Sequence, residues 1–312
     1  MSEPIRQHTV PKCYLKNFAT KRGKGWLVDV YDKKEKRHFP TSIANICVQS
    51  EFYTFSKLAS DRQNILEKFY SNKVETEYPF IYRTLTDAAI SRLEPLQRIK
   101  ALAFVYSQYT RTSKLGSALN NGWSRMLEHG HGMINPHSKD QKIYNEDGTV
   151  LIDFAGRTLE DVQKEAALEN KEMSNRKNFD NFLELNKRRL KDIIAVYRFP
   201  KDIPLITSDN PVESSKFMFD PESQFEMALD PNHLLLLLPA ISLPGFDNRE
   251  INRSEMFSNL AKLVALMYNC RQIDQAERYI IGKKTNLERA LDDYINQEAL
   301  LKELTGHYQK EH

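Results

Sequence analysis

The sequence predicts an α+β fold with a predominantly helical core and a small mixed or antiparallel sheet. Helical periodicity runs through residues 61–115, whereas strand-length apolar runs lie toward both ends, as in WLVDVY at 26–31 and LLLLL at 234–238. No internal repeat or low-complexity linker separates these regions. We therefore predict a single domain, 1–312, in three parts: a basic N-terminal helix and hairpin (1–60), a helical part (61–192) and a part with the sheet and C-terminal helices (193–312).

The N-terminal part opens with QHTVPKCYLKNFA at residues 7–19. Pro11 fits the first turn of a helix, and Tyr14, Leu15 and Phe18 share one helical face, which is typical of a helix packed on a core. WLVDVY, the charged turn DKKEKR and HFP then predict a hairpin, and EFYTF at 51–55 predicts a third short strand.

Two helices dominate the central part. The first begins at Asp61 and ends near residue 92, with a kink or break at Pro79; the second runs from Pro95 to about residue 115 and is apolar on more than one side. Residues 129–150 predict a long loop because they are rich in Gly, Asn, Asp and His. A charged surface helix follows at about 158–191.

Strand character returns in the C-terminal part, alternating with helices. The predicted strands are 193–199, 204–207, 233–239 and 277–283, and the predicted helices are 253–268 and 287–304.

Composition excludes several classes of protein. The chain of 312 residues has 40% hydrophobic and 28% charged residues, which is typical of a globular domain. Its longest apolar run is far shorter than the roughly 18 residues of a membrane span, so we expect no membrane partner. The N-terminus has no apolar segment like that of a signal peptide, so we expect a cytoplasmic location.

No recognised catalytic motif names a reaction. Cys13, Cys47 and Cys270 are far apart and odd in number, which favours reduced, mostly buried thiols. Three histidines in 129–137 have a spacing like that of metal ligands, but a Gly-rich loop does not hold ligands rigidly, so we do not assign a metal site there.

The net charge of +3 is too small to identify a polyanionic partner by itself. Basic residues cluster in the first forty residues and at 187–191. Either cluster has the charge to bind the phosphates of a nucleic acid or another phosphate-containing ligand. Solvated surface is the favoured interpretation, because neither cluster is interleaved with aromatic residues in the sequence.

Two charged residues interrupt apolar helical faces. Stepping by three or four residues from Leu66 reaches Glu77, so Glu77 is expected to face the core. On the second helix, Gln108 and Arg111 share a face with apolar residues. Buried charges must be paired, so we predict an ion pair between Glu77 and Arg111, with a purely structural salt bridge as the alternative to a functional one.

Two further polar residues stand at positions that need explanation. Asp209 follows an apolar strand within TSDNP, where either a functional site or a local Asx turn is expected. Asn259 interrupts the apolar face of a later helix, where a buried amide serves either a site or a backbone contact.

These landmarks together resemble an uncharacterised bacterial family, catalogued as domain of unknown function 4238. The resemblance spans nearly the whole chain and rests chiefly on His-x-x-Pro-x-x-Tyr-Leu-x-x-Phe at 8–18 and Thr-Ser-Asp-Asn-Pro at 207–211. The chain departs from the family pattern at Thr9, where relatives have an aromatic residue, and at Ser113, where they have proline. The resemblance implies five recurring polar residues: His8, Glu77 (or Glu75), Arg111, Asp209 and Asn259.

This set has the chemical groups for general acid–base hydrolysis of a phosphoester or glycosidic bond. We therefore hypothesise a hydrolase, nuclease-like or acting on another phosphoester, in a bacterial defence setting; a carboxylate of the set would activate water or bind a divalent metal ion. The alternative is a non-enzymatic binding or regulatory module in which the same residues form a structural network. The two hypotheses differ in whether the five residues converge in an open site.

Overall fold

The computed structural model of the chain describes residues 6–56, 58–60, 62–112, 124–133 and 141–308. They form two compact units, one containing residues up to 112 and from 179 onward, and the other covering 113–178. The α+β class is confirmed. The sheet part is larger than expected, because the first unit holds two five-stranded sheets rather than one small sheet.

The first of these sheets has the strand order β10-β11-β12-β8-β13. β13 runs parallel to β8, and the other neighbours are antiparallel. The five leucines of residues 234–238 lie on β12 and pair along their whole length with β8, so the predicted strands at 193–199 and 233–239 are confirmed. The strands are β8 (Ile193–Arg198), β10 (Glu213–Ser214), β11 (Phe225–Asp230), β12 (His233–Leu238) and β13 (Ile251–Glu255).

The second sheet has the order β2-β3-β14-β9, with β4 paired to the other edge of β3. The predicted hairpin is β3 with β4, and the predicted strand at 277–283 is β14. The strands are β2 (Thr20–Arg22), β3 (Gly25–Asp32), β4 (Arg37–Ser42), β9 (Thr207–Ser208) and β14 (Tyr279–Gly282).

A short two-stranded ribbon supports the N-terminus. β1 (Arg6–His8) pairs with β5 (Val48–Ser50), which places His8 opposite Val48. Helix α1 (Lys12–Leu15) and the 3-10 turn η1 (Lys16–Phe18) follow. Tyr14, Leu15 and Phe18 are buried as predicted, and the Tyr14 hydroxyl also lies 2.7 Å from that of Thr207 on β9. EFYTF forms turns and not the strand that the sequence predicted.

The predicted helix at 61–92 is divided into three consecutive segments. They are α2 (Ile65–Phe69), the π-helical η2 (Tyr70–Glu75) and α3 (Tyr78–Thr86). Pro79 lies in the first turn of α3, where a proline is tolerated, so the predicted break falls just before it. Asp61, the predicted start of the helix, lies outside the described residues.

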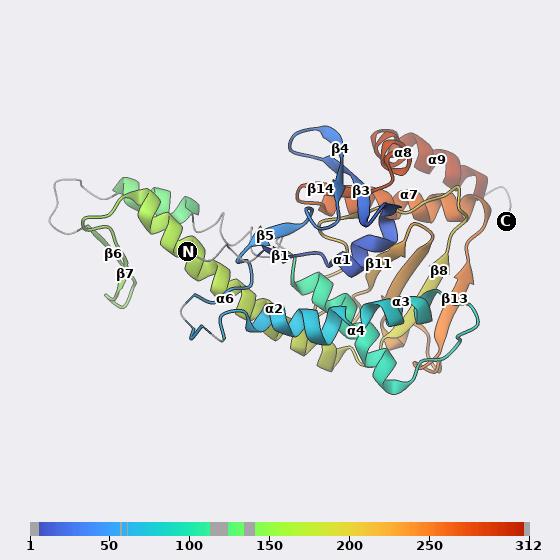
Figure 1. The fold of residues 1–312 in the computed structure, drawn as a ribbon, viewed down its shortest axis with the longest axis horizontal. Coiled ribbons are helices and arrows are strands. Elements are labelled where there is room, and N and C mark those ends of the chain that lie inside the picture. Colours follow the sequence, from blue (N-terminus) through green and yellow to red (C-terminus); the bar gives the residue numbers. More distant parts are fainter. Residues whose placement is uncertain (1–5, 57, 61, 113–123, 134–140, 309–312) are drawn as a thin grey trace. The chain divides into compact units, whose positions relative to one another are not determined.

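Helix α4 (Pro95–Thr110) is the central helix of the first unit. The Glu94 and Gln97 side chains cap its N-terminus reciprocally, and Pro95 occupies its first turn. Buried residues on several sides include Leu102, Phe104 and Tyr106, which confirms the predicted all-round burial. Phe104 also stacks on Tyr78 of α3, with 3.9 Å between the ring centroids. Figure 1 shows α3 and α4 beside each other.

The C-terminal helices are α7 (Ser258–Gln275), α8 (Lys284–Ile295) and α9 (Gln297–Tyr308), which lie together in Figure 1. The helix predicted at 253–268 begins later because residues 251–255 pair with β8 as a strand. The predicted closing helix is two helices. One buried apolar cluster joins these helices to the second sheet. It contains Ile206, just before β9, Ile280 of β14 and Leu287 of α8.

The second unit has its own small core around Leu127, Phe154 and Val162. Residues 124–133 are helical, and β6 (Lys142–Tyr144) pairs with β7 (Val150–Asp153), so the prediction of a long loop at 129–150 is wrong in these parts. Helix α6 (Leu159–Arg188) spans the boundary between the units. Within the described ranges, no helix is long and apolar enough to cross a membrane.

Candidate functional site

Arg111, at the C-terminal end of α4, is the centre of a buried polar cluster. Its side chain is fully buried, and its guanidinium donates to three groups far away in the sequence. Nη1 lies 2.8 Å from Oε1 of Glu75, Nη2 lies 2.6 Å from the carbonyl oxygen of His8, and Nε lies 3.1 Å from the Tyr53 hydroxyl. An arginine so far from water requires such partners because it stays charged.

Two aromatic rings enclose the same guanidinium. Its carbon lies 4.7 Å from the centroid of Tyr70 and 5.5 Å from that of Tyr53. The Tyr53 hydroxyl in turn donates to the backbone carbonyl of Arg111. These contacts join α4, η2 and the segment after β5 into one rigid centre.

The predicted ion pair between Glu77 and Arg111 is wrong, because Glu75 is the partner. Glu77 is half-exposed, and its carboxylate lies 2.9 Å from Nζ of Lys100. The resemblance allowed Glu75 as the alternative position, and the structure places that residue at Arg111.

The π-helical segment explains this difference of two residues. The step of 3.6 residues that leads from Leu66 to Glu77 holds only in an α-helix. In η2 the backbone hydrogen bonds join residues that are five apart in sequence. The N–H of Thr76, for example, donates to the carbonyl of Ser71. Side chains one turn apart are then more widely spaced in sequence, so Glu75 follows Tyr70 onto the Arg111 face. Such π-helical turns are rare and occur often at functional sites.

His8 lies next to this pair at the end of β1. The ring donates to the backbone carbonyl of Ile43, while Nε2 is buried and has no hydrogen-bond partner among the described residues. Burial lowers the pKa of His8 below 6.5, and the positive charge of Lys12 lowers it further. The imidazole is therefore neutral at neutral pH. With Nδ1 as the donor to Ile43, Nε2 carries the free lone pair.

Glu67 of α2 is the second group with an unpartnered buried atom. No described residue hydrogen-bonds its buried Oε2. Burial raises the pKa of Glu67 above 4.5, although the nearby Arg111 guanidinium lowers it. Glu75 acts electrostatically on both Glu67 and His8, so these side chains belong to one cluster.

Two other residues of the cluster come from α1. Lys12 is exposed, and its charge acts on both His8 and Glu67. Cys13 is close enough to Glu75 and Arg111 to interact with their charges, but burial raises the pKa of its thiol to about 12. A thiol with that pKa is a poor nucleophile, so Cys13 contributes packing rather than reactivity.

Gln108, one turn before Arg111, is fully buried, and neither of its amide atoms has a hydrogen-bond partner among the described residues. The predicted face of α4 with Gln108 and Arg111 is therefore buried, as the sequence indicated.

Asp209 does not share this cluster's contacts. Its Oδ1 accepts the backbone N–H of Glu277 at 3.0 Å, and its Oδ2 accepts those of Arg278 and Tyr279 at 2.8 and 2.9 Å. Burial raises the pKa of Asp209 to about 6, and the three N–H groups act in the opposite direction. The carboxylate holds the start of β14 against β9. It is a long-range clamp, and not the local turn that the sequence offered as the alternative.

Asn259 lies elsewhere, in a cavity between α7, α8 and α9 with a volume of about 420 Å³. Lys262 and Arg289 line the same cavity. The structure therefore brings together three residues of the predicted set, His8, Arg111 and Glu75. The other three, Glu77, Asp209 and Asn259, make their contacts with different groups. In the described residues, no group of three or more His, Cys, Asp or Glu side chains has the arrangement of a metal site.

A model of the family described as Protein of unknown function (DUF4238) matches residues 6–286. The chain belongs to this family. The match includes every residue of the Arg111 cluster in this DUF4238 chain and ends within α8, before α9. No curated protein and no solved structure matches the chain.

Sequence reasoning missed Glu67 and Tyr53 of the DUF4238 chain. A signal for Glu67 is present, because Glu67 lies three residues before the buried Tyr70 and one residue after the buried Leu66. No periodicity marks Tyr53, because it lies in a turn and meets Arg111 only in the tertiary structure.

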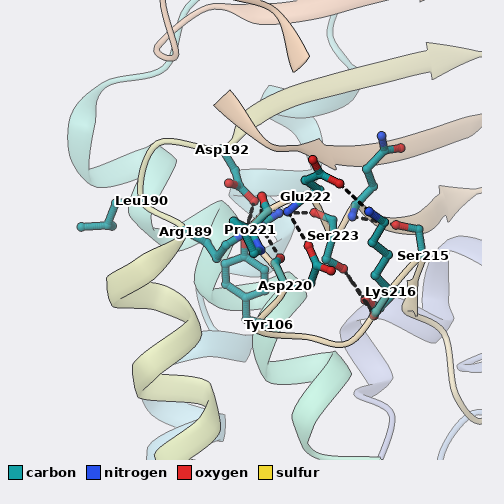
Figure 2. A network of polar contacts seen from close by, with 12 residues as sticks. Tyr106, Arg189, Leu190, Asp192, Ser215, Lys216, Asp220, Pro221, Glu222 and Ser223 are labelled. Carbon is teal, nitrogen blue, oxygen red and sulfur yellow. Dashed lines mark hydrogen bonds and ion pairs between the residues drawn. The ribbon is translucent and has the colours of Figure 1, made fainter. Parts of the chain in front are cut away.

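A separate buried centre surrounds Asp192, just after α6. The Tyr106 hydroxyl and Nε of Arg189 each donate to its Oδ2 at 2.8 Å. Figure 2 shows Arg189 between Asp192 and the segment of Asp220 to Ser223. Burial raises the pKa of Asp192 to about 6, although Arg189 and Tyr106 lower it.

This pKa predicts the sign of a pH dependence. The folded value of about 6 exceeds the ordinary 3.8, so the folded state binds a proton that the unfolded state has lost between these pH values. The stabilisation is complete below pH 3.8 and is lost as the pH rises through 6. We expect the free energy of unfolding of the wild type, relative to Asp192→Asn, to fall by about 2 kcal/mol between pH 4 and pH 7. Urea titrations of both proteins at each pH measure it, and an increase over this range would contradict it.

Proposed function

We propose that this protein is a hydrolase whose reacting groups are His8 and Glu67, held beside the Arg111–Glu75 ion pair. The observation that carries the proposal is the pair of buried, unpartnered atoms, His8 Nε2 and Glu67 Oε2, within one charged cluster. Buried polar atoms are normally hydrogen-bonded, so two unused atoms on side chains that interact with the same charged residues, Glu75 and Arg111, favour a ligand that completes them.

The shifted pKa values suit opposite roles. A lowered pKa leaves His8 as a neutral base, and a raised pKa favours the protonated form of Glu67. In a phosphoester hydrolysis, His8 Nε2 would remove a proton from water while the water oxygen bonds to phosphorus. Glu67 would donate its proton to the leaving oxygen as the bond from phosphorus to that oxygen breaks.

The choice of a phosphoester rests on charge. Lys12 is exposed beside both groups and has the charge to attract an anionic substrate. Arg111 supports the site without binding the substrate, because each of its three nitrogens donates to a protein group, Glu75, the His8 carbonyl or Tyr53. His8 and Glu67 are only half-buried as residues, which keeps the cluster close to the surface.

The experiment compares two isosteric variants with a matched control. We expect wild-type protein to hydrolyse bis(p-nitrophenyl) phosphate or p-nitrophenyl phosphate, and His8→Gln and Glu67→Gln each to lower kcat/KM by about 10²- to 10⁴-fold. Glu77→Gln is the control, because Glu77 forms only a half-exposed ion pair with Lys100. All variants are checked for thermal unfolding.

The alternative is a binding module in which the cluster is a structural network. It is favoured by Arg111, because the hydrogen bonds of its guanidinium all go to protein groups. Under that hypothesis, wild-type protein has no turnover and both glutamine variants mainly lower the melting temperature. Full turnover in His8→Gln would also exclude the proposed hydrolase.

The pH profile gives a further prediction. We expect kcat/KM to fall toward acid as His8 becomes protonated, with a midpoint below 6.5, and toward base as Glu67 loses its proton, with a midpoint above 4.5. Steady-state rates of the wild type from pH 4 to 9 measure both limbs. A profile with no acidic limb would exclude His8 as the base.

A further inference from the structure

Basic residues at the C-terminal end of α6 lie against an aromatic loop. Arg188 stacks on Phe219, with 5.2 Å from the guanidinium carbon to the ring centroid, and Phe219 contacts Phe217 edge-on at 5.7 Å. Phe217 is 69% exposed and Ile241 is 64% exposed. We name Arg188, Lys191, Phe217, Phe219 and Ile241 the Phe217 patch.

The loop that presents the two phenylalanines is firmly held. It connects β10 to β11, and its ends are joined by the Ser214 and Ser223 hydroxyls at 2.7 Å. Buried Arg189 donates to the carbonyls of Asp220, Pro221 and Ser223, as Figure 2 shows. The exposure of Phe217 is therefore built into the fold and does not result from a loose loop.

A cavity of about 370 Å³ lies within the patch. Arg188, Lys191, Phe219 and Ile241 line it together with the buried Arg189–Asp192 ion pair and apolar residues that include buried Leu185 and Met218. Lys191 is exposed and forms no ion pair with any described residue, and among those residues Arg188 pairs only with half-exposed Glu184. A pair this open to solvent contributes little, so a phosphate can replace the glutamate.

We propose that the Phe217 patch binds single-stranded nucleic acid. Proteins bind single strands by stacking bases on exposed aromatic rings beside cations that follow the phosphates, and the patch has both in one place. Phe217 would stack a base, the cavity would hold the neighbouring nucleotide against Phe219, and Lys191 and Arg188 would bind phosphates. A duplex does not expose its base faces, so it would bind the patch only through the attraction between its phosphates and the cations.

This proposal does not rest on the proposed hydrolase, because no residue of the patch belongs to the Arg111 cluster. The test is fluorescence anisotropy with labelled dT12, rU12 and a 12-base-pair DNA duplex at several salt concentrations. We expect the wild type to bind at least one single strand more tightly than the duplex.

Two variants remove separate parts of the patch. Phe217→Ala should weaken single-strand binding about tenfold at every salt concentration. Lys191→Ala should weaken it and reduce the slope of log Kd against log salt by about one. Matched controls are Phe257→Ala, because Phe257 is 66% exposed, and Lys201→Ala, because Lys201 is also exposed; both should bind as the wild type does.

Several outcomes would overturn the proposal. These are wild-type affinity in both patch variants, equal affinity of the wild type for duplex and single strands, or no binding of either strand. Binding only to phosphatidylserine vesicles would assign the patch to a membrane surface instead. Because Phe217 and Lys191 are exposed, both variants should keep the wild-type melting temperature.

Discussion

Replacing Arg111 by methionine is expected to lower the free energy of unfolding by about 3–5 kcal/mol. Methionine keeps much of the side-chain volume but removes the charge. Glu75 then loses its cation, and the His8 carbonyl and the Tyr53 hydroxyl lose a donor in a buried site. Removing one partner of a buried pair costs this much because the other partner is left uncompensated.

Urea denaturation of Arg111→Met measures the effect. Lys100→Met is the matched control, because it removes the cation from the half-exposed pair with Glu77 and should cost less than about 1 kcal/mol. Adding Glu75→Gln to Arg111→Met should recover part of the loss, since the carboxylate is then no longer charged. A cost for Arg111→Met as small as that of the control would show that the cluster does not stabilise the fold.

The second large effect is expected for Asp209→Ala, at about 3 kcal/mol or more. The variant leaves the backbone N–H groups of Glu277, Arg278 and Tyr279 without their acceptor, and each such loss in a buried site costs about 1 kcal/mol or more. The loss falls on the junction of β9 and β14, where the apolar cluster around Ile280 begins.

Asp209→Asn is the matched variant, because it keeps one oxygen acceptor and the same shape. We expect it to cost less than Asp209→Ala. Thermal unfolding and urea denaturation distinguish the two, and hydrolysis of the p-nitrophenyl phosphates gives a separate readout. A loss of hydrolysis in Asp209→Asn with wild-type stability would restore the sequence-based prediction of a catalytic Asp209.

Local patterns in the sequence were sufficient for several elements. The β3–β4 hairpin, the five-leucine strand β12 and the all-round burial of α4 each follow from periodicity or from turn residues within one segment. Patterns failed where pairing across the chain decides. Residues 251–255 continue into a helical pattern, yet they form a strand because β8 offers them a parallel partner.

Some residues of the candidate site could be predicted from the sequence, and others could not. Periodicity identified Arg111 as a buried cation, and the family resemblance identified His8. The choice of Glu75 over Glu77 could not be predicted, because a π-helical turn changes the residue spacing and no sequence signal marks it. The aromatic partners of the 187–191 cluster were missed because Phe217 and Phe219 lie on a distant loop.

The sequence by itself determined the α+β class and the presence of a buried arginine that needs partners, since composition and local periodicity carry that information. Its motifs at 8–18 and 207–211 indicated the family by resemblance. Only the tertiary structure decided that Glu75 and the His8 carbonyl contact Arg111, with Glu67 close enough to interact with its charge. It also decided that Asp209 holds two strands together and that Asn259 lies in another cavity. The physical reason is that a buried charge requires a partner but does not specify which one. That choice depends on which segments the packing of sheets and helices brings within hydrogen-bonding distance.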